Sequence, residues 1–140
     1  MKNMNVRPTS ITVVAWILII INVISLITST ISLSNLSNPM VKELLSRNPI
    51  PIPVQFVILY VGIFINLISG IAILKGQNWA RLLYVIWNFV GFVIGILTSP
   101  MKLTLLPGFL FFLVVTFFLF RPAANKYFAG TKSKINVQSN

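Results

Sequence analysis

Residues 73–84 read Ile-Leu-Lys-Gly-Gln-Asn-Trp-Ala-Arg-Leu-Leu-Tyr, a short polar turn with a cation at each end. The turn lies between two long apolar runs, each near the ~20 residues that an α-helix needs to cross the hydrocarbon layer of a bilayer. This stretch therefore predicts the head of a transmembrane hairpin. It also sets the number and direction of the spans on either side.

The composition is that of a membrane protein. The 140 residues are 56% hydrophobic and 9% charged, with a mean hydropathy of +0.92, whereas about a quarter of the residues in soluble domains are charged. At this length we expect one domain, residues 1–130, whose core forms between helices in lipid. The predicted fold class is all-α.

Four apolar runs predict four transmembrane helices, arranged as two antiparallel hairpins. The expected spans are residues 11–33, 53–74, 79–98 and 100–120. In the last span, Ser99-Pro100 has the pattern of an N-cap and first turn, and Pro107-Gly108 predicts a kink. The first run could instead be a secretory signal. However, it exceeds the usual ~7 to 15 apolar residues and no small-residue cleavage site follows it, so we expect it to remain a span.

Short amphipathic segments flank the spans. Residues 39–47 predict an interfacial helix with Asn38 as N-cap and a Glu43–Arg47 pair spaced i, i+4. Alternate prolines in residues 48–53 favour an extended, polyproline-like spacer along the membrane surface. The alternative is that this segment binds a ligand groove of another protein. Residues 122–129 predict a second interfacial helix that ends at Gly130, followed by a disordered basic tail over residues 131–140.

The cations predict the orientation. With four spans, three of the eleven Lys and Arg residues, Lys42, Arg47 and Lys102, lie on one side, and the remaining eight lie on the side of both termini. By the positive-inside rule, the N- and C-termini are cytoplasmic, and the expected location is the bacterial cytoplasmic (inner) membrane. Cations at the ends of apolar runs suit anionic lipid headgroups rather than nucleic acid.

Polar residues occupy a similar depth in three spans. Asn22, Asn66 and Asn88 lie near span centres, and Ser25 and Ser69 follow the first two by three residues. Because lipid tails cannot satisfy an amide, we expect these side chains to face the bundle interior and to bond to one another or to the backbone. They are either interhelical contacts or a midplane site for a polar ligand or ion.

Small residues on the same helical faces predict close helix packing. The predicted packing positions are Gly62, Gly70, Gly91 and Gly95. At the membrane surface, one aromatic and several cationic side chains are expected to anchor the chain to cytoplasmic lipid headgroups: Lys75, Trp79, Arg81, Arg121 and Lys126.

The residue inventory argues against catalysis. The chain has no Cys and no His, and Glu43 is its only acidic side chain. Paired carboxylates, a Ser-His-Asp arrangement and a thiolate or carboxylate metal site therefore cannot be built. We expect no enzyme activity, no metal and no cofactor.

Two motifs carry a resemblance. A helix ending in Leu-Lys-Gly at residues 74–76 is followed by Asn-Trp-Ala-Arg at residues 78–81, and the last span runs into Phe-Arg-Pro-Ala-Ala-Asn-Lys-Tyr-Phe at residues 120–128. Spans two to four with these motifs resemble a broad group of small bacterial four-span membrane proteins that has no assigned activity. The resemblance implies a fold and a location, but no function.

Three functional hypotheses follow. The chain is a small structural or interaction subunit that acts through helix–helix contacts, as a homo-oligomer or with a membrane protein partner. Alternatively, it is a channel-like, transporter-like or ligand-binding protein that uses the asparagine layer. The third hypothesis is an immunity-type protein that blocks a membrane-inserted toxin.

Overall fold

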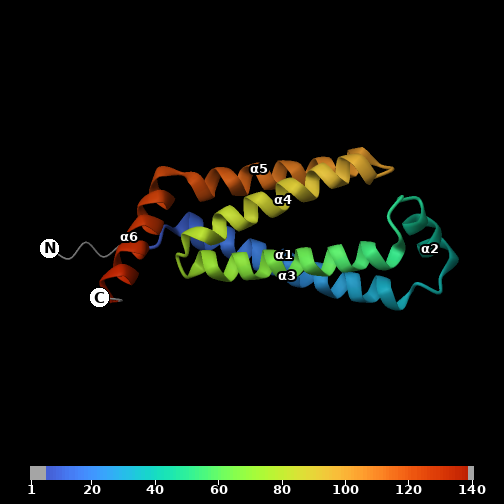
Figure 1. The fold of residues 1–140 in the computed structure, drawn as a ribbon, viewed down its shortest axis with the longest axis horizontal. Helices are drawn as coiled ribbons and strands as arrows, with labels where there is room; N and C mark the ends of the chain where they lie inside the picture. Colours follow the sequence, from blue (N-terminus) through green and yellow to red (C-terminus); the bar gives the residue numbers. More distant parts are fainter. Residues whose placement is uncertain (1–5, 139–140) are drawn as a thin grey trace.

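The computed structural model describes residues 6–138, apart from the side chains of residues 132–136 and 138. The chain is all-α, as predicted, with no strand in the described part. Figure 1 shows the elements in order: α1 (Thr9–Ser34), α2 (Pro39–Ser46), α3 (Ile52–Leu74), α4 (Asn78–Thr98), the 3-10 helix η1 (Lys102–Leu105), α5 (Leu106–Phe120) and α6 (Pro122–Gln138).

Four helical segments are long and apolar enough to cross a membrane: α1, α3, α4 and η1 together with α5. Their outward faces carry large apolar side chains, for example Leu97, which is 78% exposed, and Phe117, which is 65% exposed. Soluble monomers rarely expose apolar surface on this scale. The fold therefore has the character of a membrane protein.

Helix α3 packs against both α1 and α4, and α5 lies along the part of α4 that is away from the turn (Figure 1). Both described ends of the chain, the α3–α4 turn and α6 lie at one end of the bundle, and α2 and η1 lie at the other. We call these the head end and the α2 end. The buried core lies mainly near the head end and joins α1, α3, α4, α5 and α6 through side chains that include Ile11, Leu18, Ile73, Tyr84, Leu119 and Phe128. Away from the head end, α4 leans from α3 toward α5 (Figure 1).

The start of the last span differs from the prediction. Ser99 is the C-cap of α4, not the N-cap of the next helix, and η1 begins at Lys102. Pro107 then lies in the first turn of α5, where its missing N–H costs no hydrogen bond. The predicted long kinked α-helix is thus a 3-10 turn followed by a fifteen-residue α-helix.

The C-terminal segment also differs. Helix α6 continues to Gln138, so the predicted disordered tail is wrong for residues 131–138, and residues 139–140 lie outside the described part. Gly130 does not end the helix, since the positive-φ glycine among the described residues is Gly76. Without a left-handed residue the helix has no local stop signal at this position.

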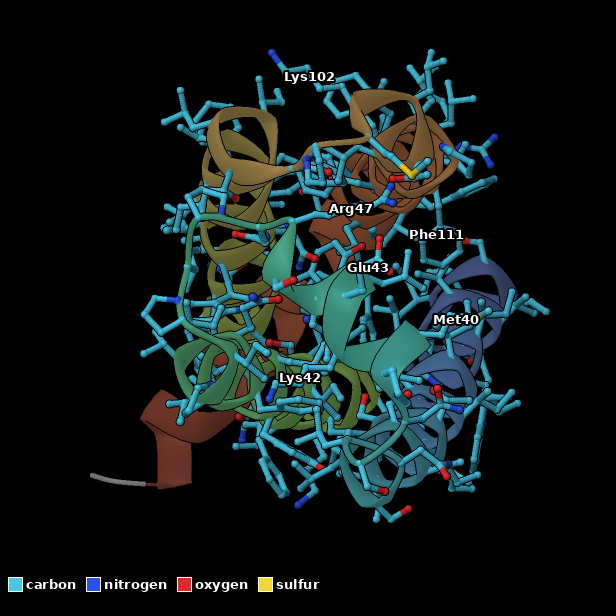
Figure 2. The ribbon with its side chains drawn as sticks, turned by 90° about the vertical axis from the view of Figure 1, so that its right-hand side faces the viewer. Met40, Lys42, Glu43, Arg47, Lys102 and Phe111 are labelled. Atoms are coloured by element: carbon cyan, nitrogen blue, oxygen red, sulfur yellow. The ribbon has the colours of Figure 1, made fainter. Side chains whose placement is uncertain are left out.

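Helix α2 forms as predicted. Asn38 Oδ1 accepts a hydrogen bond from the backbone N–H of Met40, and Arg47 pairs with Glu43 at 3.2 Å. Figure 2 looks onto this end of the bundle, with α2 in front and Lys102 on the connection between α4 and α5.

The proline-rich segment after α2 is bent, not extended. Residues 48–50 form bends, and Gln55 Nε2 donates to the carbonyl oxygens of Leu45 and Ile50 at 2.9 and 2.7 Å. These two bonds fold the segment back onto α3, which the alternation of prolines did not indicate.

Candidate functional site

The structure brings two of the three predicted asparagines together. Asn88 Nδ2 donates to Asn66 Oδ1 at 2.8 Å, which joins α4 to α3. Each amide also donates to its own helix, Asn66 to the Gly62 carbonyl at 2.9 Å and Asn88 to the Tyr84 carbonyl at 2.7 Å. Both side chains are half-buried. The pair therefore satisfies much of its own hydrogen-bonding capacity within the protein.

Asn22 does not join this pair through any described hydrogen bond. It is buried in α1 and donates to the Leu18 carbonyl at 2.7 Å. Ser25, which we expected inside the bundle, is half-buried and bonds back to the Ile21 carbonyl at 2.8 Å. Such back-bonding satisfies a hydroxyl within its own helix, so it does not need the bundle interior. Ser69 is fully buried, and its Oγ has no partner in the described part of the chain.

The glycines differ in what they face. A Cβ placed on Gly70 would lie 3.0 Å from Ile19 Cγ1, and one on Gly62 would lie 3.2 Å from Trp87 Nε1. These two positions allow close approach of α3 to α1 and to α4. Gly91 packs against no other helix of the described chain, because a Cβ there would meet nothing within 4 Å. The sequence motif is present, but α4 has leaned away from α3 at this level.

A cavity of about 150 Å³ lies where the helices diverge. We call it the seam cavity; it is lined by Trp87, Asn88, Gly91, Phe92 and Leu105. The space beside Gly95, one turn further along α4, is filled by Leu105, whose Cδ2 would lie 3.3 Å from an added Cβ. The seam cavity thus combines a half-buried amide with a glycine that has room beside it.

The α3–α4 turn is covered by α6. The Leu74 carbonyl, at the end of α3, accepts hydrogen bonds from Arg7 Nη1 at 2.9 Å and from Tyr127 Oη at 3.3 Å. Gly76 has φ +74, and an added Cβ would lie 2.8 Å from Thr131 Oγ1. A cation at a helix C-terminus is favourable. The bonds to Leu74 therefore tie both the N-terminal segment and α6 to the turn.

Arg81 departs from its predicted role as a lipid anchor. Its Nη1 bonds to Asn125 Oδ1 and, at 3.4 Å, to the Leu119 carbonyl. The guanidinium carbon lies 4.9 Å from the Phe120 ring centroid and 5.0 Å from that of Phe128. A planar cation between two aromatic rings is held by cation–π attraction. Arg81 therefore joins α4 to the α5–α6 corner.

The other predicted anchors are accessible. Lys75, Arg121 and Lys126 are exposed at the head end, and Trp79 is 49% exposed. Lys2 lies outside the described residues, as do the side chains of Lys132 and Lys134.

A second cavity, of about 400 Å³, lies between the turn and α6. We call it the head cavity; it is lined by Gly76, Gln77, Asn78, Trp79, Leu82, Phe128 and Thr131. The sequence did not indicate that α6 closes over the turn. The one feature of the sequence that could have indicated this contact is the apolar face formed by Ala124, Tyr127 and Phe128, because an apolar helix face packs against another part of the protein.

No protein-family model, curated protein or solved structure matches this chain. The asparagine pair and the two cavities are therefore the features of this chain that bear on its function.

Proposed function

We propose that this chain is a non-catalytic subunit of the bacterial cytoplasmic membrane that binds another transmembrane helix within the bilayer. The seam cavity carries the proposal. Its lining brings together Gly91, which has open space beside it, the amide of Asn88 and two aromatic residues, Trp87 and Phe92. Small residues let helix backbones approach, and an amide offers hydrogen bonds across the contact.

Helix α4 has the surface that such a contact needs. Only 11% of its apolar window is buried within the chain, compared with 28% for α1 and for α3. In lipid, helices associate through packing and interhelical hydrogen bonds, since lipid tails are as apolar as leucine. A helix seated along α4 would gain packing at Gly91. Asn88 Oδ1 would accept a hydrogen bond at the same level, since the Nδ2 group already donates within the chain.

A non-catalytic role agrees with the state of Glu43. This residue is the only acidic side chain, and it forms an exposed ion pair with Arg47. Glu43 lies on α2 (Figure 2), far along the chain from the seam cavity. An exposed carboxylate that is ion-paired with an arginine and has no second carboxylate nearby is poorly suited to acid–base chemistry.

The cation distribution supports cytoplasmic termini. Lys42, Arg47 and Lys102 lie at the α2 end (Figure 2), and Arg7, Lys75, Arg81, Arg121 and Lys126 belong to the head end. The side richer in Lys and Arg stays in the cytoplasm by the positive-inside rule. The head end is therefore assigned to the cytoplasm.

The lining of the seam cavity also favours a second candidate, a small polar ligand held beside Asn88. The structure supports this candidate less well, because the Asn88 amide group already donates to both Asn66 and the Tyr84 carbonyl. Replacing Asn88 with Leu would abolish uptake or conductance if the ligand role were the main one.

A crosslinking experiment tests the proposed contact. The chain has no cysteine, and Gly91→Cys adds a side chain where no atom lies within 4 Å. We expect this variant, treated in native membranes with a short thiol-reactive photocrosslinker that inserts into C–H bonds, to give one adduct of defined mass. An adduct of twice the chain mass identifies a second copy as the partner, and any other mass identifies a different membrane protein.

Leu97→Cys is the matched control, because Leu97 lies on the same helix and is 78% exposed. We expect only a diffuse background from this position. Gly91→Leu should abolish association without unfolding the chain, since the added side chain enters open space. Equal adduct yields at positions 91 and 97, or no adduct from either, would contradict the proposal.

A further inference from the structure

We infer that the head cavity binds one anionic phospholipid. The cavity extends from the polar turn at Gln77 and Asn78 to Leu82 on α4, and Phe128 of α6 closes one wall. It is thus polar toward the end of the bundle and apolar toward the membrane-spanning part. A phospholipid has the same order of parts, a polar headgroup above an acyl chain.

The position of the cavity fits a lipid better than a water-soluble compound. Trp79 and Leu82, both in its lining, are each 49% exposed on α4. A half-exposed tryptophan at the start of a span is typical of the membrane interface. Leu82, one turn deeper, lies where acyl chains begin. Lipid can therefore enter from the side without crossing the protein.

The polar part can bind a headgroup. Gln77, Asn78 and Thr131 contribute amide and hydroxyl groups to the lining. The Oδ1 atom of Asn78 is buried and has no hydrogen-bond partner in the described part of the chain. Buried polar atoms without a partner are uncommon. A rotation of the Asn78 side chain would bring this oxygen into the cavity, where a headgroup hydroxyl, such as those of phosphatidylglycerol, can donate to it.

The charge around the cavity favours an anionic lipid. Lys75 immediately precedes the turn and is exposed, and Arg121 and Lys126 are exposed at the same end. The first turn of α4 contains no acidic residue, and the only acidic side chain of the sequence, Glu43, belongs to α2 at the other end. Each cation near an anionic leaflet attracts it. These cations do not line the cavity; they attract an anionic headgroup to this end of the bundle.

Native mass spectrometry tests this site. The full chain is reconstituted in vesicles of equimolar phosphatidylglycerol and phosphatidylcholine, extracted in mild detergent, and the retained lipid is counted. We expect one phosphatidylglycerol per chain. Leu82→Trp fills the cavity and should lower the retained fraction by about tenfold, which corresponds to a modest loss of binding free energy. Ile86→Trp is the matched control, one turn along α4 and 60% exposed; it should retain lipid as the parent does.

Each other outcome decides against the site. Equal retention by Leu82→Trp and Ile86→Trp would show that the lipid is bound elsewhere. Equal retention of the two lipids would overturn the anionic assignment. Displacement of the lipid by millimolar glycerol 3-phosphate would show that a free phosphate ester is the ligand. If Leu82→Trp does not fold, Gln77→Leu is measured instead, since Gln77 also lines the cavity and precedes the helix.

Discussion

Asn88 donates a hydrogen bond to Asn66 over 2.8 Å, and this bond joins α4 to α3 one turn before Gly91 faces open space. It marks the level at which the two helices part. In hydrocarbon no water competes for these amides, so the bond stabilises the contact between α3 and α4.

The two asparagines should be energetically coupled. Asn66→Leu and Asn88→Leu each remove the bond, and the double variant should lose less stability than the sum of the single variants. The expected coupling is about 0.6 kcal/mol and at most about 1.7 kcal/mol, the range of interhelical hydrogen bonds in membranes. The free energy of unfolding in lipid–detergent micelles measures it. Asn22→Leu paired with Asn88→Leu should be additive, because Asn22 bonds within α1. Coupling in both pairs would contradict this arrangement.

Replacement by alanine should destabilise the protein at Gly70 but not at Gly91. Gly70→Ala places a Cβ 3.0 Å from Ile19 Cγ1 and 3.6 Å from the Ala15 carbonyl oxygen, and overpacking of this kind destabilises by about 1 to 3 kcal/mol. Gly91→Ala meets nothing within 4 Å and should change stability by less than about 0.5 kcal/mol. The free energies of unfolding of the two variants decide the point. Similar values for both would mean that α4 does not lean away from α3.

Arg81 should not tolerate lysine. An ammonium cannot reproduce the planar stacking between Phe120 and Phe128 or the paired bonds to Asn125 and Leu119. We expect Arg81→Lys to destabilise the protein by about 1 to 2 kcal/mol and to make α6 more sensitive to protease. Arg121→Lys, at an exposed position, should have little effect in either assay. Equal protease sensitivity of the two variants would mean that Arg81 acts as a surface anchor and does not hold α6.

Single cysteines test the orientation. Ser37→Cys lies before α2 and Lys75→Cys in the turn at the head end, and both positions are exposed. A membrane-impermeant maleimide added to intact cells should label position 37 and leave position 75 unlabelled until the membrane is opened. The reverse pattern would place the head end outside. Labelling of both positions would be incompatible with α3 crossing the membrane.

The sequence alone determined the four spans, the turn between α3 and α4, and α2. Runs of about 20 apolar residues, the Lys75–Gly76 turn and the Asn38 cap specify helices and their order, because hydropathy and capping act over a few neighbouring residues. Counting spans also determined which segments share an end of the bundle. The equal depth of Asn66 and Asn88 followed from their distances to the turn, since each helical residue advances about 1.5 Å.

The tertiary structure decided which faces meet. Gly91 and Gly70 look alike in sequence, yet only Gly70 faces a neighbouring helix closely. The sequence predicts that Arg81 is a lipid anchor. In the structure it contacts Asn125 and Phe128, which lie more than forty residues later in the chain. In lipid there is no hydrophobic force to select one apolar face over another. The choice depends on how side chains distant in sequence fit together, and the order of residues along a single helix does not contain that fit.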